Sequence, residues 1–365
     1  MSTKWVLHIC GKLSVGGVQA VLMNFYRNID RSKVQFAFAV QRNYPYSYDD
    51  EIKQMGGRVH YLPDMVQESQ NFKNSLYDLL KSYPEYSIVE CHFNFRNWKM
   101  LKIAKQAGVP IRISHAHAAN KKERITTKVH LGVLARLIRY YATHLVSCSI
   151  ISGEYLYETK NFTIIHNALD LEMFGYSESI RANKRNELNI GNKIALCEIG
   201  HLNDCKNQLF TLDVLSKLKQ NYVLYLVGVG EEYKRLLDEK IKELDLENRV
   251  FFLGERHDVY GLLQAFDIMI FPSKHEGLSV VCMEAQASGL PIITSDQVPV
   301  EVAVTDLVSF KPINNPNEWA QLIKKTDVSH RCNAKQQLID NGYDIKSEAE
   351  KLEKYYLKLY GELNV

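Results

Sequence analysis

The sequence predicts an α/β protein built from two doubly wound parallel sheets, on the basis of three observations. Short β-rich runs alternate with helical stretches along the chain, a pattern typical of parallel sheets. The alternation forms two series, separated by a polar stretch around 168–192. A length of 365 residues suits two domains of ordinary size. We therefore expect Rossmann-like domains at 1–170 and 171–345, and a C-terminal helix at 346–365 that crosses back to the first domain.

The elements of each series are recognised by short apolar runs and by helical periodicity. Strands of the first series are expected at 5–10, 35–40, 87–92, 110–114, 143–148 and 163–165. Strands of the second series are expected at 194–199, 223–227, 250–253, 267–271 and 291–294. Helices are expected at 210–219, 232–244 and 347–361. Because ligands of such sheets bind beyond the carboxyl ends of the strands, the cleft between the two domains is the expected site.

The composition is that of a soluble globular protein, with 46% hydrophobic and 24% charged residues. No apolar run approaches the ~18 residues that span a membrane, and the N-terminal stretch lacks the layout of a signal peptide. The seven cysteines are scattered without a CxxC pair. This usage favours buried thiols in a reducing cytoplasm over a disulfide framework or a zinc site.

The net charge of +3 conceals a basic first half. Residues 96–139 contain eleven Lys and Arg but only one acid, Glu123, and apolar residues are interleaved with the basic ones. A stretch of this kind can lie on an anionic membrane surface, and it can equally be a solvated helix face. Nucleic-acid binding is the weakest of the three interpretations, because no nucleic-acid-binding motif accompanies the charge. We expect a peripheral position at the inner face of the membrane.

Two carboxylates, Glu276 and Glu284, stand eight positions apart in the segment HEGLSVVCMEAQASGLP. The segment follows an apolar strand, and Gly289 suits the position after a helix that starts near Leu278. Eight helical positions span roughly 12 Å, which is about the distance from the sugar to the ribose of a nucleotide sugar. The free N–H groups of the first helical turn would lie between the carboxylates, where they can receive phosphate. The spacing alone also fits two solvated side chains.

Two further loops next to predicted helices carry candidate ligand-binding groups. In EIGHLNDCKNQLF, His201 and Lys206 enter a helix, where a lysine can balance a diphosphate. Gly16 and Gly17 precede the first predicted helix and allow a ligand to approach the backbone, although this is not a GxGxxG fingerprint. A simple turn and a solvated lysine are the alternatives at these places.

The loop FFLGERHDVY places Arg256 and Val259 where backbone groups can recognise a base, and an Arg256–Asp258 ion pair is the equally strong alternative. His115 and His117 follow a strand of the first series, and a metal is disfavoured there because no third ligand is evident nearby in the sequence. An imidazole that contacts a sugar hydroxyl or a phosphate is the preferred interpretation. The sequence contains no Asp-x-Asp metal–diphosphate clamp, so we expect no metal.

Several motifs, taken in this order, resemble the GT-B glycosyltransferases of family 4, and most of all the capsule and exopolysaccharide subgroup. They are GGVQ, the HAH after a strand, HNALD, the GH…KN loop, VGVGEE and HEGLSVVCMEAQASGLPII. The resemblance covers nearly the whole chain, and the two glutamates with their spacing to Lys206 are its most specific part. It implies a GT-B fold and a retaining, metal-independent transfer from a nucleotide sugar, most often a UDP-sugar, without a cofactor.

The resemblance also implies a role for each matching position. Glu276 would hold the donor hexose, Glu284 the ribose and Lys206 the diphosphate. One of His115 and His117 would contact the donor sugar, and the motif does not tell which. The expected catalytic residues are therefore Glu276, Lys206, His115 and His117. The other donor-binding positions are Gly16, Gly17, His201, Arg256, Val259, Gly277, Leu278 and Ser279.

One position departs from the family pattern in a way that affects charge. His201 stands where the family commonly has Arg, so a fixed positive charge is replaced by a group that titrates near neutral pH. Ala168 likewise occupies a position where glycine is frequent.

The function expected from these observations is transfer of a hexose or N-acetylhexosamine to a lipid-linked saccharide in surface polysaccharide synthesis. Two alternatives remain open. A GT-B nucleotide-sugar epimerase would release free product without an acceptor, and a non-catalytic nucleotide-sugar-binding partner would bind the donor without transfer.

Overall fold

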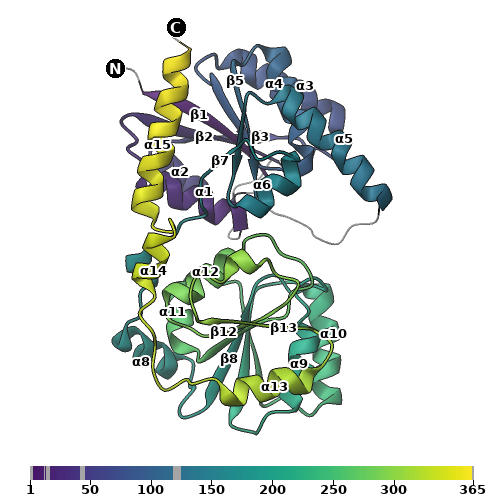
Figure 1. Ribbon diagram of the computed structural model, residues 1–365, viewed down its shortest axis with the longest axis vertical. Coiled ribbons are helices and arrows are strands. Elements are labelled where there is room, and N and C mark those ends of the chain that lie inside the picture. Colours follow the sequence, from purple (N-terminus) through teal and green to yellow (C-terminus); the bar gives the residue numbers. More distant parts are fainter. Residues whose placement is uncertain (1–2, 12, 14–16, 42–45, 118–124, 364–365) are drawn as a thin grey trace. The chain divides into compact units, whose positions relative to one another are not determined.

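The computed structural model describes residues 3–11, 13, 17–41, 46–117 and 125–363, which form two compact units. One unit comprises Met1–Ala168 together with Asp344–Val365, and the other comprises Leu169–Tyr343. Each unit contains one parallel sheet flanked by helices (Figure 1). The expected fold class, two Rossmann-like α/β units, is therefore confirmed.

The sheet of the first unit has seven strands in the order β3-β2-β1-β4-β5-β6-β7, and all its strand pairs are parallel. The strands are β1 (Lys4–Cys10), β2 (Val34–Gln41), β3 (Arg58–Leu62), β4 (Ile88–Cys91), β5 (Ile111–Ala116), β6 (His144–Ser147) and β7 (Thr163–Ile164). The helices are α1 (Gly17–Asn28), α2 (Asp49–Gln54), α3 (Ser69–Ser82), α4 (Asn97–Ala107), α5 (Ile125–Tyr141), α6 (Ile150–Tyr157) and α15 (Ile345–Glu362). The central strands are buried along both faces because helices cover both.

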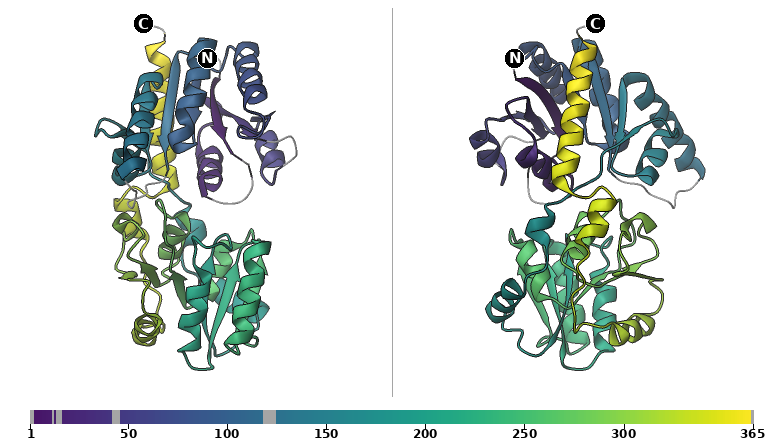
Figure 2. Two further views of the ribbon diagram at one scale, coloured as in Figure 1. Left: turned by 90° about the vertical axis from the view of Figure 1, so that its right-hand side faces the viewer. Right: turned by 60° about the vertical axis from the view of Figure 1, so that its left-hand side comes forward.

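The C-terminal helix α15 packs against α1 and β2 of the first unit, as the two views in Figure 2 show. Asp344 starts the helix by accepting a hydrogen bond from the backbone N–H of Ser347. Tyr356 is fully buried and donates from its hydroxyl to Glu90 in β4, and Lys33 pairs with Glu353 at 2.9 Å. The last helix therefore belongs to the core of the first unit.

The sheet of the second unit has six parallel strands in the order β10-β9-β8-β11-β12-β13. The strands are β8 (Ile194–Ile199), β9 (Tyr222–Val227), β10 (Val250–Gly254), β11 (Ile268–Phe271), β12 (Ile292–Ser295) and β13 (Val308–Lys311). The helices are α7 (Leu171–Phe174), α8 (Glu178–Glu187), α9 (Gln208–Ser216), α10 (Glu231–Glu243), α11 (Val259–Ala265), α12 (Val280–Ala287), α13 (Pro316–Lys325) and α14 (Lys335–Asp340). Among the described helices, each is too short or too polar to cross a membrane.

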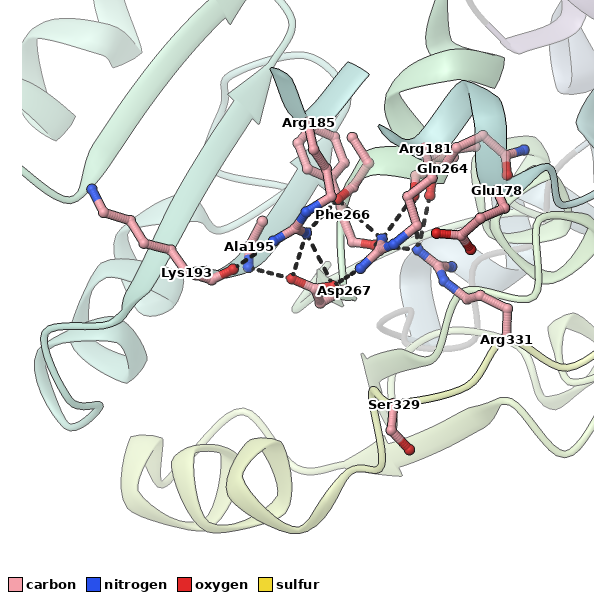
Figure 3. Close-up of polar contacts among 12 residues, drawn as sticks. Glu178, Arg181, Arg185, Lys193, Ala195, Gln264, Phe266, Asp267, Ser329 and Arg331 are labelled. Atoms are coloured by element: carbon pink, nitrogen blue, oxygen red, sulfur yellow. Dashed lines mark hydrogen bonds and ion pairs between the residues drawn. The ribbon is translucent and has the colours of Figure 1, made fainter. Parts of the chain in front are cut away.

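A buried aspartate, Asp267, joins α8 to the start of β11 (Figure 3). One of its carboxylate oxygens accepts from Arg181 at 2.5 Å and the other from Arg185 at 3.1 Å, and the backbone N–H of Ala195 donates at 2.7 Å. Arg181 also donates to the carbonyl groups that end α11, and Arg331 reaches the same helix end. These arginines satisfy carbonyls that have no partner within the helix.

We predict that Asp267→Ala lowers the free energy of unfolding of the second unit by about 3–5 kcal/mol, because it leaves two part-buried arginines without their carboxylate. Urea unfolding measures this when Trp5 and Trp98 are replaced by Phe, so that the buried Trp319 reports the second unit. The control is Asp204→Ala, which removes an exposed ion pair with Lys274 and is expected to cost less than about 1 kcal/mol. Equal effects of the two substitutions would contradict the assignment.

Candidate functional site

The candidate site of the second unit lies at the carboxyl ends of β8, β9, β10 and β11. The chain continues from β8 to β9 on one side of the sheet, whereas β11 pairs with β8 on the other side. This is a topological switch point, where loops diverge and leave room for a ligand. The loops after β8 and β11 carry Lys206 and Glu276, two of the predicted residues.

Lys206 and Glu276 form an ion pair although they are 70 positions apart in the sequence. The lysine Nζ lies 2.7 Å from Glu276 Oε1, and the two side chains are 19% and 14% exposed. The same Nζ lies 4.6 Å from the centre of the Phe271 ring. The backbone N–H of Lys274 donates to the carbonyl of Cys205 at 2.8 Å and joins the two loops. The structure thus places a cation and a carboxylate together in one partly desolvated position.

Two glycines allow the loops after β8 and β9 to pack closely. A Cβ on Gly228 would lie 2.0 Å from the carbonyl oxygen of Gly200, and Gly228 has φ of +141°. A Cβ on Gly200, which has φ of +150°, would lie 3.1 Å from Lys206 Cε. Side chains at these positions would displace the loop that carries the lysine.

The N-terminus of α12 adjoins this pair. Ser279 is the residue before the helix and its side chain makes no cap hydrogen bond, so the N–H groups of the first turn remain available to an anion. Gly277 and Leu278 lead into this turn, and Leu278 is buried. Gly289 has φ of +65° just beyond the helix, consistent with the predicted helix end.

Glu284 lies within α12, and burial raises the pKa of its carboxyl from 4.5 to about 7. Its surroundings disfavour the ionised form, and hydrogen bonds from a ligand's hydroxyl groups would favour ionisation. A perturbed carboxyl of this kind is typical of a binding position.

The sequence analysis missed Glu198, which is buried in β8 directly beside the site. Its Oε2 accepts from Thr211 at 2.7 Å, and its Oε1 has no hydrogen-bond partner among the described residues. Burial raises the pKa of Glu198 to about 8, Lys206 lowers it and Glu276 raises it. An acid inside the apolar run IALCEI was the available signal.

Arg256 is held in a group of ion pairs, whereas His201 is exposed. Arg256 donates to Asp258 at 2.7 and 2.6 Å and to Glu187 at 3.1 Å, so the ion-pair interpretation describes its contacts. These bonds raise the pKa of Arg256, and Val259 begins α11 beside it. His201 is exposed, and its carbonyl accepts from Gln208 at 3.1 Å.

The predicted residues of the first unit are partly described. Gly16 lies outside the described residues, and Gly17 begins α1. His115 and His117 are both buried at the end of β5. His115 Nδ1 lies 2.6 Å from Glu90 Oε1, whereas His117 Nε2 lies 2.8 Å from His92 Nδ1.

Two doubly wound units, with a lysine–glutamate pair and an open helix N-terminus at the switch point of the second, define a protein of the GT-B class. Residues 180–344 match the family model described as "Glycosyl transferases group 1". The chain is 32% identical to EpsF of Bacillus subtilis, a proposed glycosyltransferase, over 97% of each chain. The chain therefore belongs to the group 1 glycosyltransferases.

Two further relatives bear on the site. The chain is 25% identical to the UDP-Gal:alpha-D-GlcNAc-diphosphoundecaprenol alpha-1,3-galactosyltransferase of Escherichia coli, over 94% of each protein. The crystal structure of Anabaena HepE in complex with UDP and glucose superposes with a TM-score of 0.81 at 18% identity, covering 97% of this chain and 100% of that one. The structural likeness supports the fold.

We predict that Glu198→Gln stabilises the second unit in a pH-dependent way. Below about pH 4.5 Glu198 is protonated in both the folded and the unfolded chain. Between 4.5 and about 8 only the unfolded chain ionises, so the native glutamate costs stability progressively as pH rises. The substitution should change little at pH 5 and add on the order of 1–3 kcal/mol at pH 8.

Urea unfolding at the two pH values, with Trp319 as reporter, measures this difference. Glu239→Gln makes the same chemical change at an exposed position of α10 and should have little effect at either pH. A gain for Glu198→Gln that is equal at pH 5 and pH 8 would show that Glu198 is not held protonated.

Proposed function

We propose that this glycosyltransferase moves a hexose or N-acetylhexosamine from a UDP-sugar to a lipid-linked saccharide acceptor, with retention, in surface polysaccharide synthesis. The observation that carries the proposal is the Lys206–Glu276 pair beside the open N-terminus of α12. The Escherichia coli relative, a galactosyltransferase named for a UDP-Gal donor and a diphosphoundecaprenol acceptor, supports both a UDP-linked donor and a lipid diphosphate acceptor. The Anabaena complex with UDP and glucose also supports a UDP-linked donor.

The main chemical requirement of this reaction is to stabilise the negative charge that develops on the departing diphosphate. Lys206 supplies a point charge, and the first-turn N–H groups of α12 supply oriented dipoles. Glu276 holds hydroxyl groups of the sugar and Glu284 those of the ribose. Charge stabilisation in this arrangement comes from the chain itself, and transfer proceeds without a metal on the diphosphate.

The Lys206–Glu276 contact also balances the charge of the lysine before a donor binds. In the structure the lysine is neutralised by Glu276, so a partly desolvated cation is not left alone. A bound diphosphate would take over the lysine as its counter-charge, and Glu276 would then accept from sugar hydroxyls. Donor binding thereby replaces one ion pair by another and couples sugar recognition to diphosphate recognition.

We predict that Lys206→Ala lowers kcat/KM for transfer by about 10²–10³-fold, because charge stabilisation of the leaving diphosphate is lost. Glu276→Gln should raise KM for the UDP-sugar while leaving UDP affinity within a few-fold. Both are measured with a UDP-sugar panel and a lipid diphosphate saccharide acceptor. Lys274→Ala is the matched control, because Lys274 is on the adjoining loop and pairs with the exposed Asp204.

Full transfer by Lys206→Ala would show that the site is assigned wrongly. Sugar release that needs no acceptor would indicate the epimerase alternative, and UDP binding without any transfer would indicate the non-catalytic one.

The second part of the proposal is that the first unit docks on the anionic inner face of the membrane. Along α5, Val129, Val133, Arg136 and Tyr140 follow one another at helical spacing and are all exposed, with 68%, 52% and 66% exposure for Val129, Val133 and Tyr140. α4 packs against α5 and exposes Lys99, Lys102 and Lys105. The Lys105 ammonium lies 4.3 Å from the Tyr140 ring centre, which joins the cationic row to the apolar one.

An exposed apolar row beside a row of lysines matches an anionic lipid surface, where apolar side chains enter the interface and lysines contact headgroups. Each lysine near such a surface contributes ~1 kcal/mol at physiological salt. The segment KKER at 121–124, which adds basic residues to this region, lies outside the described residues.

We predict that the double variant Lys102→Glu, Lys105→Glu lowers co-sedimentation with vesicles containing phosphatidylglycerol by at least about tenfold. The matched control is Lys73→Glu, Lys81→Glu on α3, which makes the same charge change at exposed positions of the same unit. Binding of the parent to neutral vesicles at equal strength, or equal loss in both variants, would contradict this docking surface.

A further inference from the structure

The first unit contains a chain of three buried histidines that crosses the carboxyl ends of three adjacent strands. His8 lies in β1, His92 directly follows β4 and His117 directly follows β5. His8 Nδ1 lies 3.1 Å from His92 Nε2, and His92 Nδ1 lies 2.8 Å from His117 Nε2. All three are at most 7% exposed.

Burial keeps these three imidazoles neutral. It lowers the pKa of His8 to about 4, and it lowers the pKa of His92 and of His117 well below the usual range. A neutral imidazole has one N–H and one bare nitrogen. His92 has a histidine nitrogen on each side, so it must donate to one neighbour and accept from the other. The chain of hydrogen bonds therefore has a direction.

The surroundings of the two chain ends select one direction. If the bonds ran inward, from His117 to His8, the His8 Nε2 would carry a hydrogen in a position that is buried and has no partner among the described residues. An orphaned buried N–H is rarer and costlier than an unpaired acceptor. If the bonds run outward, His8 Nε2 is only a bare lone pair, and His117 carries its hydrogen on Nδ1.

The outer end is suited to a donor. His117 Nδ1 and the Oδ1 of Asn167 are both buried and lack a hydrogen-bond partner among the described residues. The side chain of Asn167 opposes the lowering of the His117 pKa, as an oxygen beside an N–H does. A hydrogen on His117 Nδ1 would thus have the side-chain oxygen of Asn167 as its acceptor.

The rings are also fixed in orientation. The His8 ring packs 4.2 Å from that of Phe36 and 5.6 Å from that of Phe38, and the His117 ring stacks on His115 at 4.2 Å between centres. The backbone N–H of His117 donates to Asn94 at 3.1 Å. The His117 residue is thus held by stacking on His115, by its backbone N–H and by the hydrogen bond at Nε2. A flip of the ring that exchanged Nδ1 and Nε2 would break the bond at Nε2.

We propose that His8 and His92 are positioning residues, which fix His117 as a neutral imidazole whose hydrogen on Nδ1 is offered to an acceptor oxygen, that of Asn167 in this structure and that of a sugar substrate in the complex. The role for substrate rests on the proposed function, whereas the tautomer does not. The structure also separates His117 from His115, because His115 Nδ1 is bonded to Glu90, which in turn accepts from Tyr356. Of the two predicted histidines, His117 is the one that His8 and His92 orient.

A bound metal ion is the competing use of these groups, since ring nitrogens of His92, His115 and His117 all lie within 4.8 Å of one another. The distances favour hydrogen bonds. Two imidazole nitrogens on one tetrahedral zinc, each at about 2.0–2.1 Å, are about 3.3 Å apart, whereas His92 Nδ1 and His117 Nε2 are 2.8 Å apart.

The first test is the tautomer of His117 in the full chain. Long-range proton–nitrogen correlation spectra of histidine-labelled protein near pH 5.5 distinguish the two neutral tautomers, while exposed histidines are largely protonated at that pH. Loss of its signals in His117→Asn assigns the residue. We expect the hydrogen on Nδ1. A hydrogen on Nε2 overturns the proposal, and so does a stoichiometric metal in the purified protein that disappears in His92→Leu.

The second test is the effect of His92 on turnover. His92→Leu keeps an apolar side chain in the cavity but removes both hydrogen bonds, so the His117 ring loses the bond that holds its Nε2 in place, and we expect kcat to fall about 10²-fold. UDP affinity should be unchanged. His92→Gln, whose amide can accept from His8 and donate to His117, should recover at least about tenfold of that loss.

Unchanged kcat in His92→Leu, or no recovery of kcat in His92→Gln relative to His92→Leu, would overturn the positioning role. If the parent chain transferred no sugar from any UDP-sugar, the proposed function would fail while the tautomer measurement still decided the histidine chain.

Discussion

The arrangement around Lys206 and Glu276 depends on one constraint, the parallel pairing of β11 with β8. This pairing aligns Ile268 with Leu196 and Met269 with Cys197, so the two strands end at the same edge of the sheet. The loops that follow then bring Lys206 and Glu276 to 2.7 Å. The α12 N-terminus enters the same place because the helix begins within a short loop after β11. A strand between β8 and β11 would separate the cation from the carboxylate and from the helix N–H groups.

The free-energy cost of burying ionisable groups near strand ends is reduced in three different ways in this molecule. Asp267 is paired with two arginines and a backbone N–H. Glu198 accepts one hydrogen bond from a neutral hydroxyl, and burial raises its pKa although Lys206 opposes the rise. His8 and its two neighbours lose their charge and bond to one another. The choice follows from the number of charged partners that reach each group.

The sequence was sufficient to predict most central strands and the loops that carry Lys206 and Glu276, because the strands are short apolar runs that end in polar or glycine-containing turns. The edge strands β3 and β13 were missed. β3 has the sequence RVHYL, and most of its residues are only partly buried. All of β13 is only partly buried as well. Neither strand therefore forms an apolar run. Glu198 was missed for a related reason, since one acid within a strand does not alter the apolar pattern by which the strand is recognised.

The two histidines of the HAH motif show where sequence reasoning ends. The motif places His115 and His117 on one strand, two positions apart, and nothing in it distinguishes them. Their partners come from strands that lie far away in the chain: Glu90 from β4 for one, and His92 with His8 for the other. Only the strand order β1-β4-β5 brings these groups into contact. The difference between the two imidazoles, one bonded to a carboxylate and one at the end of a directed chain of hydrogen bonds, is therefore a property of the sheet and not of the motif.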